Sequence, residues 1–140
     1  MDLNARFLGF TATLAALAVA GLAAAECAPA LTWATRYSGP GGGTDLAYGT
    51  AINPANGDVY VVGSEYVSPA QGNNWRIRRY NSAGTLQNTA SYDGALSGDD
   101  VCTYVAVDQA GGVIVSGFQE VAGQGINWLV RKYSESGRVE

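Results

Sequence analysis

Short apolar runs alternate with clusters of glycine, asparagine, proline and serine from residue 32 onward. Residues of these cluster types punctuate strands, and the first runs therefore predict strands at 32–37, 46–53, 59–65 and 75–80. No segment after residue 30 has a helical apolar period of useful length. The third run is apolar at successive positions, which indicates a sheet covered on both faces. The pattern predicts an all-β fold.

The apolar pattern occurs twice and forms an internal repeat. Residues 31–55 align without a gap on residues 86–110, an offset of 55, and seven of the 25 pairs are identical, including Tyr37 with Tyr92 and Asp45 with Asp100. After one deletion the offset is 54, and Gly63 matches Gly117. After a second deletion the offset is 53, and the matches are Asn74, Trp75, Arg78, Tyr80 and Gly84 with Asn127, Trp128, Arg131, Tyr133 and Gly137.

The repeat predicts the architecture. A four-stranded unit of about 55 residues, repeated and covered on both faces, is typical of one blade of a β-propeller. The units span 31–85 and 86–138, and residues 139–140 begin a third. Gly63 and Gly117, which close equivalent strands, mark a bend or a close backbone approach. We expect two four-stranded antiparallel blades of a partial β-propeller after an N-terminal signal helix.

Two blades do not close a propeller, which has about four to eight. Three explanations fit: a fragment of a longer propeller, an assembly of several chains, or an open sandwich of two blades. The expectation is a truncated or partial propeller, because the sequence reaches the opening strand of a third unit.

The first 25 residues have the layout of an export signal. A short polar start with Arg6 precedes residues 7–25, which carry no charge and end in three alanines. Small residues before the cleavage point are typical of a secretory signal. The alternative is a retained membrane anchor, since about 19 apolar residues can span a bilayer. We expect a signal peptide at 1–25, a short tail at 26–30, and a product outside the membrane once the signal is removed.

Composition excludes several function classes. The chain has no histidine, so it cannot supply a Ser-His-Asp or Cys-His catalytic group or a histidine-ligated metal. Its net charge of −4 argues against nucleic acid as a partner, because nucleic acid requires a basic face. No catalytic, cofactor-binding or metal-ligating residue is assigned, and no cofactor is expected.

Two sets of motifs carry a resemblance to a known family. The first set is Tyr37-Ser-Gly-Pro, Asp45-Leu-Ala-Tyr, Gly57-Asp-Val-Tyr-Val-Val-Gly63 and Arg79-Tyr80. The second is Tyr92-Asp-Gly, Asp99-Asp100, Gly111-Gly-Val-Ile-Val-Ser-Gly117 and Lys132-Tyr133. Together they resemble the bacterial beta-propeller repeat (SBBP) family over about residues 31–140, with Asn53 where the family usually has aspartate. The resemblance implies bacterial propellers that are secreted, periplasmic or at the cell surface. It implies no catalytic residues, because fold alone does not give function.

Aromatic side chains are the first candidates for binding. Trp75 and Trp128 recur at one repeat position, which favours packing between blades over an exposed platform for carbohydrate or peptide. Trp33 has no counterpart, since Asn88 stands in its place, and it is the candidate for ligand contact. The residues predicted to have a structural role in the blades are Tyr37, Gly63, Trp75, Tyr80, Tyr92, Gly117, Trp128 and Tyr133.

Two arginines are further candidates for ligand contact. Arg76 and Arg78 share one strand face with Tyr80, because side chains alternate along a strand. They could recognise a carboxylate or a sulfate. The sequence favours the other interpretation, that these charges protect an outer strand from pairing with another sheet edge.

The aspartates and cysteines have more ordinary interpretations. Ca²⁺ needs about six to eight oxygens, and the chain lacks an alternating aspartate ladder, so we expect its loop aspartates to cap turn amides. Cys27 and Cys102 are the only cysteines, and in an oxidising compartment they predict one disulfide. The alternative is two free thiols. A nucleophilic role is not expected without a local base.

These observations favour a secreted, non-enzymatic β-propeller repeat module that acts as a binding or surface-interaction scaffold. Its partner would be a protein or a carbohydrate, and copies of the chain or further blades would complete the propeller. Two other function classes stay open: part of a propeller enzyme of the lyase, lactonase or quinone-dependent type, and a self-assembling structural repeat. An enzyme would need ionisable side chains pointing inward from several blades, whereas the acids here fall mostly in turns.

Overall fold

The structure is a computed structural model that describes residues 29–134. The chain divides into two units, Met1–Ala30 and Leu31–Glu140, and the fold described below belongs to the second. The predicted signal segment 1–25, Cys27 and residues 138–140 lie outside the described residues. Within 29–134, no helix has the length and apolarity needed to cross a membrane.

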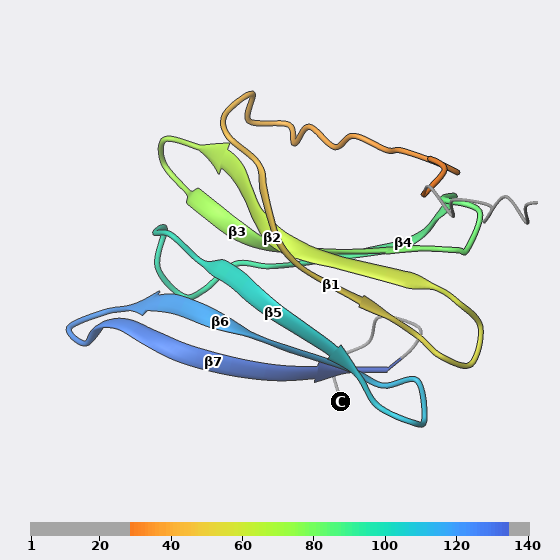
Figure 1. Ribbon diagram of the computed structural model, residues 1–140. Helices are drawn as coiled ribbons and strands as arrows, with labels where there is room; N and C mark the ends of the chain where they lie inside the picture. The colour runs from red at the N-terminus through yellow and green to blue at the C-terminus, as the bar shows by residue number, and fades with distance from the viewer. Residues whose placement is uncertain (1–28, 135–140) are drawn as a thin grey trace, which may run out of the picture. The chain divides into compact units, whose positions relative to one another are not determined.

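Seven antiparallel strands form two sheets, which confirms the all-β prediction. Sheet A has the order β1-β2-β3-β4, and sheet B has the order β5-β6-β7. The two sheets lie against each other, as Figure 1 shows. The strands are β1 (Leu46–Ile52), β2 (Val59–Ser68), β3 (Gly72–Tyr80), β4 (Leu86–Tyr92), β5 (Val101–Val107), β6 (Val113–Val121) and β7 (Gly125–Tyr133).

Tight turns join successive strands where the sequence places glycine. The N–H of Gly57 donates to the carbonyl of Asn53 at 2.8 Å, and the N–H of Gly84 donates to that of Asn81 at 2.9 Å. Both glycines have positive φ, 76° and 81°, which side chains with a Cβ adopt only at a cost. The predicted turns therefore form, and within each sheet every strand pairs with the next along the chain.

Segment 32–37, predicted as a strand, is not one. Its repeat counterpart, β4, is a strand because the edge of β3 supplies hydrogen-bonding partners. Segment 32–37 has no such neighbour and lies across the face of sheet A that is turned away from sheet B (Figure 1). Sheet A therefore runs from 46 to 92, one strand later than the repeat unit, and Trp75 and Trp128 lie in third strands rather than fourth ones.

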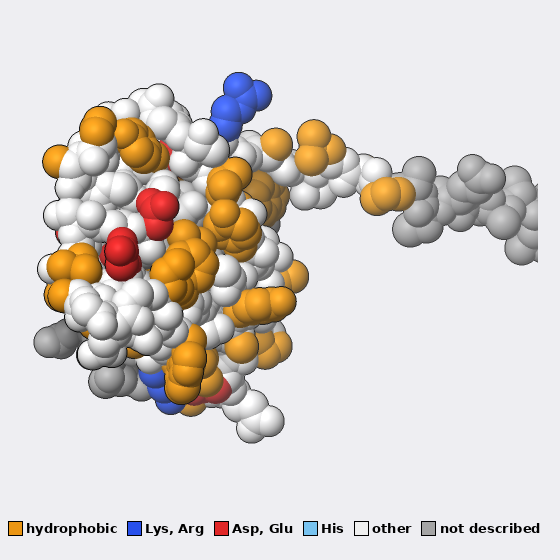
Figure 2. Space-filling view, turned by 90° about the vertical axis from the view of Figure 1, so that its left-hand side faces the viewer, with side chains coloured by type: hydrophobic (Ala, Val, Ile, Leu, Met, Phe, Trp, Pro, Cys, Tyr) orange, Lys and Arg blue, Asp and Glu red, His pale blue; other side chains and the backbone are white. Residues whose placement is uncertain are grey.

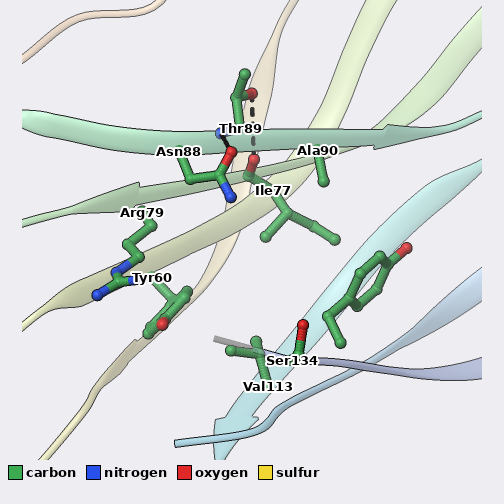
Figure 3. A pocket seen from close by; sticks show the side chains of 9 residues that line it. Tyr60, Ile77, Arg79, Asn88, Thr89, Ala90, Val113 and Ser134 are labelled. Carbon is green, nitrogen blue, oxygen red and sulfur yellow. Dashed lines mark hydrogen bonds between the residues drawn. The ribbon is translucent and has the colours of Figure 1, made fainter. Parts of the chain in front are cut away.

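The core lies between the two sheets. Sheet A contributes Tyr60, Val62, Trp75 and Ile77, and sheet B contributes Cys102, Val113, Val115 and Tyr133. At one end of this interface a cavity of about 20 Å³ separates the sheets (Figure 3), close to the smallest volume that holds one water. Close packing at this contact fixes which faces of the sheets remain outside.

Trp75 is the largest fully buried side chain of the described residues. Its Nε1 donates to the carbonyl of Phe118 at 2.9 Å. Its ring lies edge-on to Tyr92, with centroids 5.6 Å apart. The indole is thus held by one hydrogen bond to sheet B and one ring of its own sheet.

Gly63 and Gly117 lie where two backbones approach closely, as predicted. A Cβ on Gly63 would stand 1.8 Å from the carbonyl oxygen of Leu46, and one on Gly117 would stand 2.0 Å from that of Val101. Each glycine lies opposite a β-bulge in the neighbouring strand. The two bulges are equivalent in the repeat and bend both sheets in the same way.

Candidate functional site

A groove of about 480 Å³ lies between segment 33–37 and the outer face of sheet A, the face turned away from sheet B. Its lining includes Trp33, Arg76 and Arg78, the three residues predicted as ligand contacts. Ala47 of β1 and Gly63 of β2 also line it. The fold therefore brings together in one groove three side chains that the sequence could only propose separately.

Arg76 is neutralised within this groove. Its Nε lies 2.7 Å from Oε2 of Glu65, whose side chain is 6% exposed. Its Nη2 donates to the hydroxyl of Tyr37 at 2.7 Å. Burial, and then the hydrogen bond with Glu65, raise the pKa of Tyr37 above its ordinary value. Arg76 is thus committed to its neighbours and is a weak attractor for an external anion.

Arg78 is held by two aromatic rings. Its guanidinium carbon lies 4.1 Å from the ring centroid of Tyr37 and 5.6 Å from that of Tyr80. Its Nε also donates to the Tyr80 hydroxyl at 2.7 Å. Trp33 stacks on Tyr80 at 6.1 Å and is half-buried. Cation–π contacts of this kind favour a flat, ordered wall, so the groove is lined by rings rather than by mobile charge.

The interpretation that the sequence favours for these arginines, protection of a sheet edge, is wrong. β3 lies between β2 and β4 and is a central strand of sheet A. Its backbone groups are already paired on both sides. The charges on β3 therefore belong to a face, where they meet the rings of segment 33–37.

The same arrangement of rings and arginine occurs between the two sheets. Arg131 of β7 lies 4.1 Å from the ring centroid of Tyr92 and 5.5 Å from that of Tyr133. The Tyr92 hydroxyl donates to Oε1 of Gln119, the repeat counterpart of Glu65. Tyr37 therefore stands on sheet A as Tyr92 stands on sheet B. Segment 33–37 occupies the place that the edge strand of a preceding sheet would take.

The groove is built from the residues equivalent to those around Trp75. Tyr92 and Phe118 contact that indole, and the repeat offsets place Tyr37 and Ser64 at the corresponding positions on sheet A. Both line the groove. Cys102 and Gly117, paired next to Phe118, likewise correspond to Ala47 and Gly63. The groove thus lies at the same repeat positions as the Trp75 socket.

Ala47 and Ser64 escaped prediction, because the two copies differ at these positions. Ala47 stands opposite Cys102 in the repeat, and Ser64 stands opposite Phe118. Neither residue type carries a chemical signature of its own. The only signal in the sequence is their place in the alignment, and it has meaning only once the surroundings of Trp75 are known.

Trp128 does not pack as Trp75 does, contrary to expectation. It is 82% exposed and lies on the outer face of sheet B, the face turned away from sheet A, because side chains alternate along a strand. Within residues 29–134 no element covers that face. The other large apolar side chains exposed there are Tyr104, Ile114, Ile126 and Val130.

Asp45 and Asp100 cap backbone amides, which confirms that prediction. Asp45 accepts hydrogen bonds from the N–H groups of Gly39, at 2.6 Å, and Tyr66, at 3.0 Å. Asp100 accepts the equivalent bonds from Gly94 and Glu120. Burial raises the pKa of Asp100, and these two bonds oppose that rise. The pair of aspartates fastens the loop before each first strand to the strand beside it.

Asn53 and Asp108 occupy one repeat position and make the same turn. Asn53 Oδ1 accepts from the N–H of Ala55 at 3.0 Å, and Asp108 Oδ1 accepts from that of Ala110 at 2.9 Å. Asparagine thus replaces the aspartate of the repeat without loss of the turn. Asp108 also pairs with Lys132 at 3.0 Å, and the hydrogen bond with Lys132 lowers its pKa.

Carboxylates are also visible at the end of the sheets where the β2–β3 and β6–β7 turns lie. Figure 2 shows this end, with acidic side chains near its centre and hydrophobic ones around them. Within the described residues, no three His, Cys, Asp or Glu side chains gather in a way that could hold a metal ion.

Cys102 is fully buried and forms no disulfide within the described residues. Burial raises its pKa to about 12, so the thiol stays protonated near neutral pH. A protonated thiol is a poor nucleophile. Its predicted disulfide partner, Cys27, lies outside the described residues, and the pairing stays a prediction.

Comparison with known proteins adds no assignment to these observations. The chain matches no protein-family model, and no curated protein matches it. The groove, the repeat and the exposed face of sheet B are therefore the features that bear on its function.

Proposed function

We propose that this chain is an exported, non-enzymatic β-propeller repeat module that binds other proteins through the groove on sheet A. In this role it is a surface-interaction scaffold. The resemblance to the bacterial beta-propeller repeat family supports the propeller assignment. So does the recurrence of one contact geometry, in which Arg78 and Arg131 each lie 4.1 Å from an equivalent tyrosine.

One observation carries the choice of a protein partner: the groove lies at the repeat positions that, in the other copy, surround a tryptophan. Its equivalent, the Trp75 socket, receives an indole from a neighbouring sheet. A groove of this shape and lining suits an aromatic side chain presented by another β-sheet. Such buried aromatic anchors commonly dominate protein interfaces.

The charges in the groove support a protein over an acidic carbohydrate. Arg76 already pairs with Glu65, and Arg78 is stacked between two rings. An acidic sugar would have to displace one of these contacts to gain a guanidinium. The wall offers aromatic and aliphatic surface instead, and burial of such surface is the main driving force of association.

The titratable groups support a binding role over catalysis. The pKa of Tyr37 lies above its ordinary value, so its hydroxyl stays protonated near neutral pH. Glu65 is held in an ion pair. A general base needs access to its substrate, and the ion pair with Arg76 and the 6% exposure of the Glu65 side chain deny it that access.

An NMR titration tests the groove. The probe is 3-methylindole, which has the side chain of tryptophan, and the protein is the full chain with Trp128→Lys, so that no exposed indole of another copy competes. We expect shifts of the amide signals of Ala47 and Gly63. The amides of Cys102 and Gly117, in the socket that Trp75 already fills, are the internal control and should not move.

The same titration with oligogalacturonate separates the two ligand classes. We expect no shift in the groove with this acidic sugar. If the sugar shifts the groove signals and 3-methylindole does not, the groove is a carbohydrate site and the proposal is wrong. If 3-methylindole moves the control amides as strongly as the groove amides, its binding is nonspecific and the proposal also fails.

Export is tested separately by expression of the full chain in a bacterium. Mass spectrometry of the product should give a mass that starts near residue 26, and the protein should be found outside the cytoplasm. An uncleaved product that sediments with membranes would support the alternative of a retained anchor.

A further inference from the structure

We infer that the partner that fits the groove is a second copy of this chain, which inserts Trp128 and pairs its β7 edge with segment 31–37. This inference rests on the proposed function and names its partner. It follows from the repeat, because the contact between sheets A and B is itself an interface between two equivalent units. Sheet A and sheet B each have an outer face, turned away from the other sheet, on which a contact of the same kind can form.

The outer face of sheet B matches the face of sheet A that is buried in the chain. On sheet A, the residues that face sheet B include Tyr60, Trp75 and Ile77. The repeat offsets place Ile114, Trp128 and Val130 at the equivalent positions of sheet B. These three side chains are 38%, 82% and 52% exposed. Sheet B therefore presents outward the apolar surface that sheet A buries.

The groove face of sheet A matches, in the same way, the face of sheet B that is buried. On sheet B, Val115, Arg131 and Tyr133 face sheet A. Their equivalents on sheet A are Val61, Arg78 and Tyr80, and all three line the groove. The two exposed faces of one chain are thus counterparts of two faces that already fit each other.

Trp128 has a defined place in this contact. Trp75 donates from Nε1 to the carbonyl of Phe118 and lies edge-on to Tyr92. The equivalent contacts for Trp128 are the carbonyl of Ser64 and the ring of Tyr37, both in the second copy. Ser64 and Tyr37 line the groove, so the indole has both a hydrogen-bond acceptor and a ring partner there.

The strand edges give an independent constraint. In sheet A, β4 pairs with β3, with Tyr92 opposite Trp75 and Ala90 opposite Ile77. Among the described strands, β7 pairs with β6 alone, so its second edge is open. The counterpart of β4 is segment 31–37, which is not a strand here. The same register would place Tyr37 of one copy opposite Trp128 of the other, and Thr35 opposite Val130.

The charges on the two faces are compatible with this contact. Where sheet B has Gln119 and Leu129, sheet A has Glu65 and Arg76, and these two form an ion pair that is neutral overall. Arg78 is stacked on rings as Arg131 is inside the chain. A buried charge without a partner strongly destabilises a contact. Docking would leave neither Glu65, Arg76 nor Arg78 in that state.

The contact joins unlike faces, so copies would add head to tail. Interfaces of this kind form closed rings when the rotation between subunits allows it. Propellers close with about four to eight sheets. The described residues of each copy form two sheets, so a ring of this 140-residue chain would hold about two to four copies.

Light scattering during gel filtration of the full chain tests the assembly. At about 100 µM we expect an oligomer, and Trp128→Lys should weaken it by about 100-fold or more in dissociation constant, as loss of a central aromatic anchor does. Ala122→Lys, which adds the same charge at the exposed tip of the β6–β7 turn, is the matched control and should leave the oligomer intact. Because Trp128 is 82% exposed, its substitution should not unfold the chain, and circular dichroism checks this.

Cysteine cross-linking tests the register. In a Cys27→Ser background, Thr35→Cys with Val130→Cys should form a disulfide between copies. Ile77→Cys with Ala90→Cys, the equivalent pair inside sheet A, should form one within a single chain and calibrates the geometry. Arg36→Cys with Val130→Cys should not link, because a slip of one residue turns the side chain to the opposite face.

Each outcome decides the inference. An oligomer that depends on Trp128 and links through residues 35 and 130 supports it. A chain that stays monomeric at 100 µM overturns it, and so does an oligomer that survives Trp128→Lys or links through residue 36. The 3-methylindole titration is independent of these results. A monomer whose groove binds the indole keeps the proposed function and loses only the second copy as its partner.

Discussion

Trp75 and Trp128 occupy one repeat position but differ most in their surroundings, and this gives the sharpest prediction about stability. Trp75 is fully buried, whereas Trp128 is 82% exposed. Truncation of a buried tryptophan to alanine costs about 3 to 5 kcal/mol. Loss of the Nε1 bond also leaves the carbonyl of Phe118 without its donor, which adds about 1 kcal/mol. Trp75→Ala should thus lower the free energy of unfolding by about 5 kcal/mol, a large part of the roughly 5 to 15 kcal/mol of a typical domain.

The assay is unfolding by urea, followed by circular dichroism, at a concentration where light scattering shows monomers. Trp128→Ala is the matched control, and we expect a change within about 0.5 kcal/mol, as for most exposed positions. Trp75→Phe should fall between the two, because it keeps a ring in the core and loses the hydrogen bond to Phe118. In a thermal scan, Trp75→Ala should lower the midpoint by about 15 °C or more.

Two results would refute this reasoning. If Trp75→Ala costs less than about 1 kcal/mol, the contact between sheets A and B does not hold the fold together. If Trp128→Ala costs the monomer as much as Trp75→Ala, the outer face of sheet B is covered within a single chain. Either result would remove the difference between a buried Trp75 and an exposed Trp128, and the proposed docking of Trp128 in the groove rests on that difference.

Three further predictions concern the backbone, a buried thiol and a buried carboxylate. Gly63→Ala should destabilise the chain by about 2 kcal/mol or more in urea unfolding, because its Cβ would stand 1.8 Å from the carbonyl oxygen of Leu46; an unchanged midpoint would contradict the close approach. Cys102 has its pKa raised to about 12, above the roughly 8.5 of an exposed thiol. The unfolded chain therefore holds fewer protons above that pH, so the contribution of this thiol to stability is complete below pH 8.5 and declines as the pH rises toward 12. Cys102→Ala should flatten the profile measured from pH 7 to 10, and an unchanged slope would argue against this cause. Asp100→Ala should cost about 1 to 3 kcal/mol because the N–H of Gly94 loses its acceptor, and Asp100→Asn, which keeps an oxygen, should cost less in the same assay.

The alternation of apolar runs and turn residues located most strands, because local chain chemistry decides where a strand begins and ends. The first strands predicted at 46–53, 59–65 and 75–80 correspond to β1, β2 and β3. β2 and β3 are longer than predicted at the turn that joins them, where Ser68 and Gly72 continue the pairing. Hydrogen bonds between neighbouring strands extend pairing through polar residues that show no apolar pattern, and the sequence alone does not reveal this.

Segment 32–37 shows the opposite case, a strand that the sequence predicts and the structure lacks. Its sequence resembles that of β4 closely enough to align with it, yet it has no strand beside it and lies on the rings and arginines of sheet A. A strand is a property of a pair of segments, since its backbone groups need a partner. The pattern of one segment therefore does not decide whether that segment forms one.

The sequence by itself determined the all-β class, the repeat and the turn positions, and it marked Gly63 and Gly117 as points of a bend or close approach. The pattern of apolar runs and turn residues is local in the chain, and the repeat shows it twice. Only the tertiary structure decided that Trp33, Arg76 and Arg78 share one groove, that Arg76 is neutralised by Glu65, and that Trp75 is buried while Trp128 is exposed. These facts depend on which sheet face meets which. Trp75 and Trp128 share a residue type and a place in the repeat, and they differ in burial because only Trp75 has a second sheet packed against it. Contacts between distant parts of the chain decide where that second sheet lies.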